Sequence, residues 1–199
     1  MGENKMQNKK IASIAAVTVA GIVAVVMSLN GLQSGSDITY VEVDGELPPF
    51  TVDDLSKGAK YVVIGKVISI TPTDKVSEEA SKTSPIYSDV VIGVQRDLTN
   101  QFQDKQISVR IMGGQIGNTV VQAEHTPEFT IGEDVLVFVA DKAPHTVWGD
   151  NYYVAGLELG KYRLANGNAF GIEHPDGINE EAFISKIQNA RIAKIGIIP

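Results

Sequence analysis

The sequence predicts a mainly β protein: a small antiparallel barrel that follows one hydrophobic helix near the amino terminus. Three observations support this. A long uncharged apolar run lies near the amino terminus, five or six segments rich in β-branched residues follow, and glycines interrupt two of those segments, at Gly65 and Gly93. Short turns and the lack of long intervening helices favour an antiparallel barrel. A sandwich of two sheets is the alternative fold.

The apolar run, residues 11–29, is predicted to be a transmembrane signal-anchor. It contains no charge, follows Lys9 and Lys10 directly, and is just long enough to cross about 30 Å of hydrocarbon at about 1.5 Å per residue. Residues 1–10 are then a cytoplasmic tail and residues 30–48 a tether. The lysines before the run place the rest of the chain outside the cytoplasm. A cleaved signal peptide, which gives a secreted protein, is the alternative.

Composition narrows the classes of function. The chain has no cysteine, which excludes disulfides, thiolate metal sites and cysteine nucleophiles. Because Lys5, Lys9 and Lys10 outweigh Glu3 by two charges and the apolar run has none, the part after the run carries about −9 although the whole chain carries −7. An acidic surface repels phosphate backbones, so a nucleic acid is an unlikely partner.

The elements after the tether follow from local patterns. Thr51 is a predicted N-cap, with acidic residues in the first turn of a short helix that Gly58 ends. Residues 61–70 form the strongest predicted strand, apolar at nearly every position, so both of its faces are expected to be covered. Gly65 marks either a bulge or bend of this strand or room for a bulky neighbour. Residues 71–85 are predicted to be a long polar loop.

The remaining elements complete the barrel domain, predicted to span residues 49–175. Strands are expected at residues 87–98, 106–112, 135–140 and 152–159. Asn166-Gly167 predicts a tight hairpin between residues 161–164 and 168–172. Apolar residues at helical spacing, among them Phe183 and Ile187, predict a carboxyl-terminal helix within residues 176–199, packed on the barrel.

One resemblance goes beyond these patterns. A small helical turn, then KYVVIGKVISI, a polar loop, YSDVVIGVQRDLTNQFQDKQISVRIMGG and EDVLVFVADK, resembles the netrin-type module, the OB-like barrel of the tissue inhibitors of metalloproteinases. The match covers about residues 58–165 as hydrophobic pattern and spacing. That family inhibits zinc proteases through an amino-terminal cysteine, which this chain lacks. The resemblance therefore implies an OB-like fold and not the inhibitory activity.

Catalytic and metal-binding patterns are weak. His125, His145 and His174 are the candidate metal ligands, but they are far apart in the sequence and lack a local ligand spacing. No serine stands in a GxSxG motif, and adjacent carboxylates such as Glu133-Asp134 fall at turns and helix starts. The glycine-rich residues 112–118 lack the lysine of a phosphate-binding loop and favour a bulge or turn. We therefore expect no cofactor, no metal and no catalytic residue.

Aromatic residues offer the candidate ligand-binding surface. Trp148, Tyr152 and Tyr153 cluster in HTVWGDNYYV, where exposed rings would bind a sugar, a peptide or a single strand by stacking. Packing in the core is the competing use of these rings. The sequence thus predicts a non-catalytic, membrane-tethered, extracytoplasmic module that binds an envelope or extracellular protein or ligand. The alternative is an extracytoplasmic hydrolase, with or without a metal, in which at least two histidines meet a carboxylate in a pocket.

Overall fold

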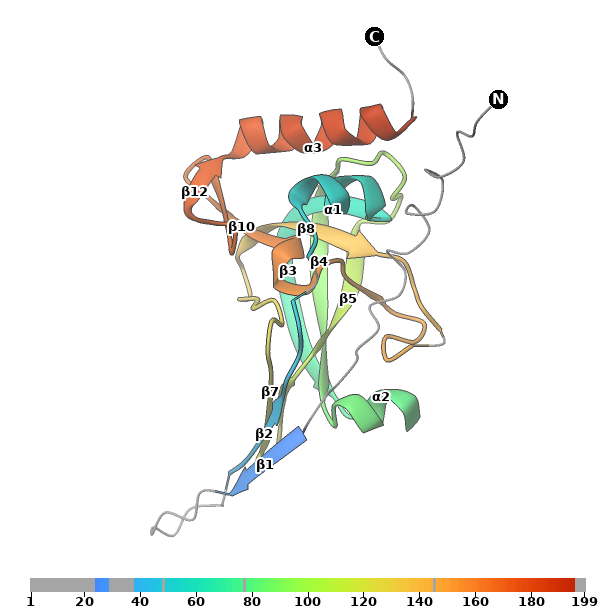
Figure 1. Ribbon diagram of the computed structural model, residues 1–199, viewed down its shortest axis with the longest axis vertical. Coiled ribbons are helices and arrows are strands. Elements are labelled where there is room, and N and C mark those ends of the chain that lie inside the picture. The colour runs from blue at the N-terminus through green and yellow to red at the C-terminus, as the bar shows by residue number, and fades with distance from the viewer. Residues whose placement is uncertain (1–23, 29–37, 48, 77, 145, 196–199) are drawn as a thin grey trace, which may run out of the picture.

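A closed barrel of five strands forms the centre of the molecule (Figure 1). The computed structural model describes residues 24–28, 38–47, 49–76, 78–144 and 146–195. The barrel strands are β3 (Tyr61–Thr73), β4 (Tyr87–Asp97), β5 (Gln106–Met112), β8 (Asp134–Ala140) and β9 (Tyr152–Val154). They pair in the closed order β8-β3-β4-β5-β9-β8, and only the β5–β9 pair is parallel. The predicted mainly β class and barrel are confirmed, and the arrangement is consistent with an OB-like barrel.

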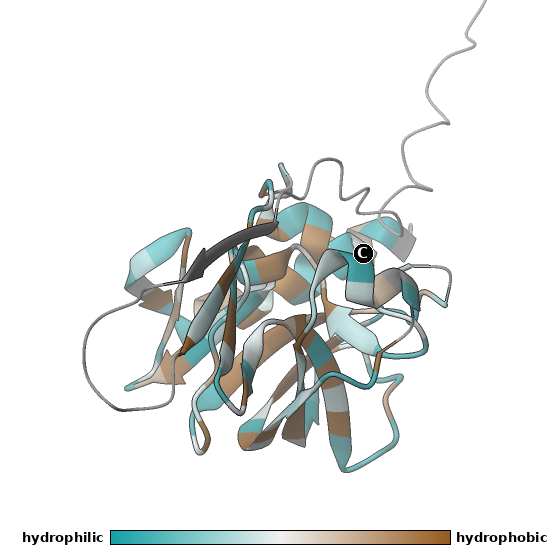
Figure 2. Ribbon diagram, turned by 90° about the horizontal axis from the view of Figure 1, so that it is seen from below, coloured by the Kyte–Doolittle hydropathy of each residue, from teal (hydrophilic) through white to brown (hydrophobic). Residues whose placement is uncertain are grey.

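Both faces of β8 and of the first half of β3, as far as Gly65, are buried, whereas Lys66 and Ile68 farther along β3 are exposed. The two-sided burial expected for residues 61–70 therefore holds for the first part of that run. One set of side chains, including Val63, Val137 and Val109, comes from all five barrel strands and fills the interior. The alternate set, including Val62 and Phe138, packs outside the barrel in a second cluster that contains residues of the helices. Apolar residues gather in the strands, while the connecting turns are mostly hydrophilic (Figure 2).

Gly65 allows β3 and β4 to approach closely. The register of the two strands shifts between Ile64 and Gly65, which is a β-bulge. A Cβ atom at position 65 would overlap the carbonyl oxygen of Gly93 and lie 2.9 Å from the Ile92 side chain. Both alternatives raised for this glycine therefore apply: it marks a bulge, and it leaves room for a neighbour, namely the backbone of Gly93 and the side chain of Ile92.

The sheet extends beyond the barrel because β8 pairs with two different strands along its length. Its first half pairs with β10 (Lys161–Ala165), whereas its last two residues pair with β9. β10 continues into β11 (Asn168–Gly171) and β12 (His174–Asn179). The hairpin predicted at Asn166-Gly167 joins β10 to β11, and both turn residues have the positive φ that this turn requires.

A second, smaller sheet was not predicted. It contains β1 (Ala24–Ser28), β2 (Thr39–Val43), β6 (Gly114–Ile116) and β7 (Thr119–Ala123), in the order β1-β2-β7-β6. β2 lies within the predicted tether, residues 30–48, yet it pairs in parallel with β7. The glycine-rich residues 112–118 end β5 and form β6 with the turn to β7.

The membrane span falls mostly outside the described residues. Of the predicted span at residues 11–29, only Ala24–Ser28 is described, and it forms β1 opposite β2 where a helix was expected. Residues 11–23 and 29, the predicted tail at 1–10 and residues 30–37 lie outside the described ranges. Among the described helices, none has the length and apolar character needed to cross a membrane. The span remains a prediction.

Among the helices of the described residues, α1 (Val52–Gly58) and α3 (Glu180–Ile195) pack against each other at one end of the barrel (Figure 1). The described helices also include α2 (Glu78–Thr83) and η1 (Leu157–Gly160). The predicted cap at Thr51 is present, in a capping box with Asp54. α2 and the end of β3 occupy much of the predicted loop at 71–85.

The carboxyl-terminal helix lies within residues 176–199, as predicted, and packs against α1. It begins at Glu180, because the preceding residues pair with β11 as β12. Phe183 and Ile187 are fully buried beneath it. The Arg191 guanidinium donates to the carbonyl oxygens of Ser56 (2.7 Å) and Ala59 (3.2 Å), next to the carboxyl end of α1. These bonds satisfy carbonyls that a helix end leaves without partners.

Candidate functional site

The predicted aromatic cluster is largely part of the core. Trp148 and Tyr153 are each 4% exposed, and their rings stack 4.9 Å apart at an interplanar angle of 6°. Tyr152 is half-buried and packs edge-on against Tyr61. The burial of Trp148 and Tyr153 favours the packing use of these rings, and Tyr152 alone of the three offers more than a small fraction of its surface to a ligand.

The candidate metal ligands do not form a cluster in the described residues. His145 lies outside them. His174 packs near the rings of Tyr162 and Phe183, at centroid distances of 6.4 and 6.1 Å. His125 pairs with Glu158. In the ranges that the structure describes, no three His, Asp or Glu side chains are grouped so as to hold a metal ion.

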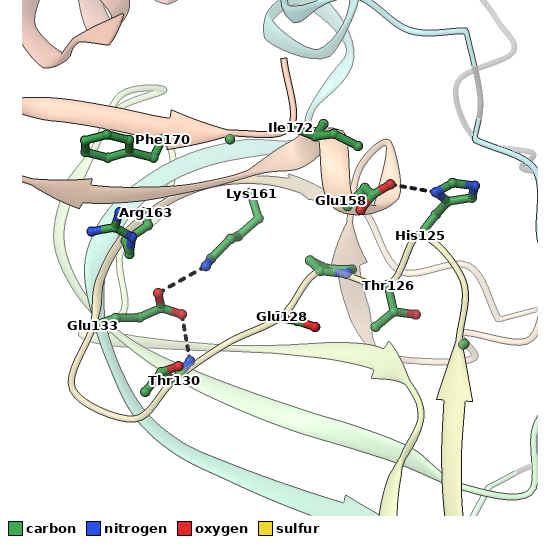
Figure 3. A pocket seen from close by; sticks show the side chains of 13 residues that line it. His125, Thr126, Glu128, Thr130, Glu133, Glu158, Lys161, Arg163, Phe170 and Ile172 are labelled. Carbon is green, nitrogen blue, oxygen red and sulfur yellow. Dashed lines mark hydrogen bonds and ion pairs between the residues drawn. The ribbon is translucent and has the colours of Figure 1, made fainter. Parts of the chain in front are cut away.

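His125 instead lines a polar groove with a volume of about 600 Å³ (Figure 3). One wall is the segment between β7 and β8, and the other comes from η1, β10 and β11. The ionisable residues of the lining are His125, Glu128, Glu133, Glu158, Lys161 and Arg163. Phe170, Ile172 and Pro127 add apolar surface. Segments that are distant in the sequence thus meet at the point where β10 pairs with the first half of β8.

Lys161 and Glu133 form an ion pair that joins the two walls. Their side chains are 15% and 10% exposed, and the Lys161 Nζ atom lies 3.1 Å from Glu133 Oε2. The other carboxylate oxygen of Glu133 accepts a hydrogen bond of 2.7 Å from the backbone N–H of Thr130. The ammonium group also lies 5.4 Å from the centre of the Phe129 ring. With these partners, both charges are occupied within the protein.

His125 and Glu158 form a second pair at the other end of the groove. The Nδ1 atom of His125 lies 2.6 Å from Glu158 Oε1, and the backbone N–H of Glu158 donates to the His125 carbonyl. In Figure 3 the Nε2 edge of the ring faces away from Glu158. A carboxylate on one ring nitrogen fixes the orientation of an imidazole and leaves the other nitrogen for a ligand or a proton.

The backbone on both sides of this pair is left-handed, a conformation that histidine adopts more readily than leucine. His125 has φ of 55° and Leu157, directly before Glu158, has φ of 56°. The other positive-φ residues apart from glycine in the described ranges are asparagines, Asn100 and Asn166, which adopt this conformation readily. A leucine there is unusual, and such strain persists only where the surroundings enforce it, commonly at functional sites.

Arg163 and Glu128 are the two charged residues of the groove that remain without an ion-pair partner among the described residues. Arg163 is exposed, and its guanidinium lies 4.5 Å from the centre of the Phe170 ring, directly opposite it across the hairpin. Gly177 packs against the same ring and leaves no room for a side chain there. Phe170 therefore supports the guanidinium and leaves its edges free to bind an anion.

Comparison with known proteins adds no assignment: no protein-family model matches the chain, and no curated protein matches it in sequence. Of the groove residues, sequence reasoning had singled out His125 as a ligand candidate and Glu133 as half of a carboxylate pair. Arg163 and Phe170 had a usable signal, because counting outward from the Asn166-Gly167 turn places them opposite each other. Glu128 and Glu158 had no comparable local signal.

Proposed function

We propose that the protein is a membrane-tethered, extracytoplasmic binding module and that the groove beside Arg163 is its binding site. The apolar run at residues 11–29 and the lysines before it support the tether and its orientation. The observation that carries the binding role is the exposed guanidinium of Arg163, supported on Phe170 at the groove and not engaged by a carboxylate of the described residues. The partner is another component of the cell envelope or an extracellular molecule.

The geometry of the groove suits recognition. Its volume of about 600 Å³ falls within the range of roughly 300–1,000 Å³ that is usual for ligand sites. The Lys161–Glu133 and His125–Glu158 pairs hold its walls in place before a ligand arrives. A preorganised site loses less conformational entropy on binding.

Cross-linking in the native membrane tests this proposal. The tagged full-length protein is expressed in its source cells, cross-linked and purified, and the captured molecules are quantified. Arg163→Glu should reduce capture of a specific partner at least about tenfold, because it places a repelling charge where the partner's anion binds. Arg96→Glu is the matched control, since Arg96 is an exposed arginine of β4 that does not line the groove. Equal capture by the two variants would contradict the proposal.

The hydrolase is the second candidate function, and the His125–Glu158 pair is the observation that favours it. A carboxylate-oriented histidine is a common general base, with Nε2 available to accept a proton from water. Purified full-length protein would be assayed against ester, peptide and glycoside substrates. His125→Gln should abolish any activity that belongs to this site, while His174→Gln, outside the groove, should leave it intact. Activity equal in both variants would exclude this role for His125.

A further inference from the structure

The charges of the groove indicate which ligand it binds. Of its six ionisable side chains, four form two pairs within the protein, Lys161 with Glu133 and His125 with Glu158. The two that remain, Arg163 and Glu128, are opposite in sign, and neither forms an ion pair with another residue that the structure describes. They also lie on different walls: Arg163 is on β10, and Glu128 is in the segment between β7 and β8.

We infer that the groove binds a polypeptide segment that carries one acidic and one basic group, the acid on Arg163 and the base on Glu128. This inference rests on the proposed binding role of the groove. A ligand with only an anion would satisfy Arg163 and leave Glu128 repelling it. A ligand with only a cation would face the reverse problem. The bipolar ligand is therefore the one whose charges complement both side chains.

Two further features of the lining support a peptide. Phe170 gives the groove an apolar surface beside Arg163, which suits an apolar side chain next to the acid of the ligand, and the 47%-exposed Ile172 adds apolar surface near Glu158 (Figure 3). The hydroxyl groups of Thr126 and Thr130 line the opposite wall, where they can bond with peptide groups. A short extended peptide with a charged group near each end, and with apolar side chains and peptide groups between them, would match this lining.

The test uses peptides of defined charge order. Peptides capped at both ends carry one Glu and one Lys separated by one to three valines, in both orders, and their binding to the detergent-solubilised full-length protein is measured by calorimetry. The best binder should lose affinity about tenfold when its Glu or its Lys is replaced by Gln, the effect of removing one charge-assisted contact. An uncapped trivaline is also tested, because its free amino and carboxyl termini supply both charges. Its binding shows whether the groove recognises chain termini or charged side chains.

Charge exchange in the protein gives the sharper result. Arg163→Glu and Glu128→Lys should each weaken the best peptide about tenfold, and the double variant should prefer the peptide with the reversed order of charges. Arg96→Glu should change nothing. Both substituted side chains of the groove are exposed, and matching circular dichroism spectra and melting temperatures would show that each variant folds.

The outcomes separate this inference from the proposed function. If the double variant prefers the peptide with Glu and Lys in the reversed order, the bipolar ligand is supported. Tight binding of trivaline also supports it, with the chain termini supplying the two charges. Equal binding of peptides with one charge, or an unchanged affinity in Glu128→Lys, overturns it. If no peptide binds but cross-linked capture still depends on Arg163, the bipolar inference is wrong and the binding module stands. If capture is also independent of Arg163, both fail.

Discussion

Trp148 and Arg163 lie on either side of β9 and η1 in the sequence, yet the structure uses the two side chains in opposite ways. Trp148 is 4% exposed and stacks on Tyr153 within the core. Arg163 is exposed and also rests on an aromatic ring, that of Phe170, but at the edge of a polar groove. The ring of Tyr153 therefore packs with Trp148 in the core, whereas the ring of Phe170 supports the unpaired guanidinium of Arg163.

The difference explains why we propose the binding site at the groove and not at the aromatic cluster. Large rings gain most when water is removed from them, so an aromatic cluster near the barrel packs unless something holds it open. Charged side chains resist burial unless they are paired, so an unpaired charge stays at the surface. The residues left unpaired therefore indicate a binding site more directly than the rings do.

The largest expected effect comes from removing the ring that is buried. Trp148→Ala should lower the free energy of unfolding by about 4 kcal/mol, because it opens a cavity and removes the contacts of the indole with Tyr153 and Tyr87. Denaturant unfolding followed by circular dichroism measures this. Tyr152→Ala, at a half-buried ring, is the comparison and should cost less.

The same pair of variants tests the aromatic cluster as a binding surface. At a temperature where Trp148→Ala remains folded, its capture of a partner should equal that of the unmodified protein. Loss of capture with little loss of stability would restore the prediction that Trp148, Tyr152 and Tyr153 bind the ligand.

The second largest effect is expected at the base of the groove. Lys161→Ala should lower the free energy of unfolding by about 3 kcal/mol, because Glu133 would keep a largely buried charge without its partner. Lys161→Met combined with Glu133→Leu should restore most of this loss, since neither charge then remains. Thermal melts of these two variants and of the unmodified protein measure the effect. If the double variant loses as much stability as Lys161→Ala, the ion pair stabilises the fold by more than keeping each buried charge neutralised.

The sequence predicted those parts of the fold that depend on neighbouring residues. The capping box at Thr51, the turn at Asn166-Gly167, the bulge at Gly65 and the two-sided burial of the first half of β3 are all local in origin. The parallel pairing of β2 with β7 was missed, because no local pattern joins Val41 to Val121. The groove was missed for the same reason: Glu128 and Arg163 come to line one groove only through the pairing of β8 with β10.

The third prediction compares two carboxylates. Asp97 accepts several hydrogen bonds within the protein, whereas Glu128 forms no ion pair with the described residues. Burial raises the pKa of Asp97, but hydrogen bonds from the Phe102 and Gln101 N–H groups and from Thr99 outweigh it, so the net pKa lies below its ordinary value of 3.8. A folded-state pKa below that of the unfolded chain adds stability above about pH 4, and the gain is lost as the pH falls further.

Asp97→Asn should therefore destabilise the protein by about 1 kcal/mol at pH 7 and by less at pH 3, because the amide turns a donor toward N–H groups that need an acceptor. Glu128→Gln should leave the free energy of unfolding unchanged at both pH values and lower the affinity for the bipolar peptide. Urea unfolding at the two pH values measures the difference. Equal destabilisation by Asp97→Asn at both would contradict the role assigned to its charge.

The smallest effect is expected at Tyr162, a buried ring directly behind the groove. Its ring leaves no room for a side chain at Gly171, and no group of the described residues forms a hydrogen bond with its hydroxyl oxygen. Burial raises the pKa of this phenol, with a further contribution from the charge of Glu173. Tyr162→Phe removes a buried hydroxyl without breaking a bond to the protein, so the free energy of unfolding should stay constant or rise by less than about 1 kcal/mol. Binding of the bipolar peptide should also stay constant, because the ring that fixes Gly171 is retained. A loss of stability would mean that the hydroxyl bonds a solvent molecule in the core, and a loss of binding with stability unchanged would place Tyr162 within the site itself.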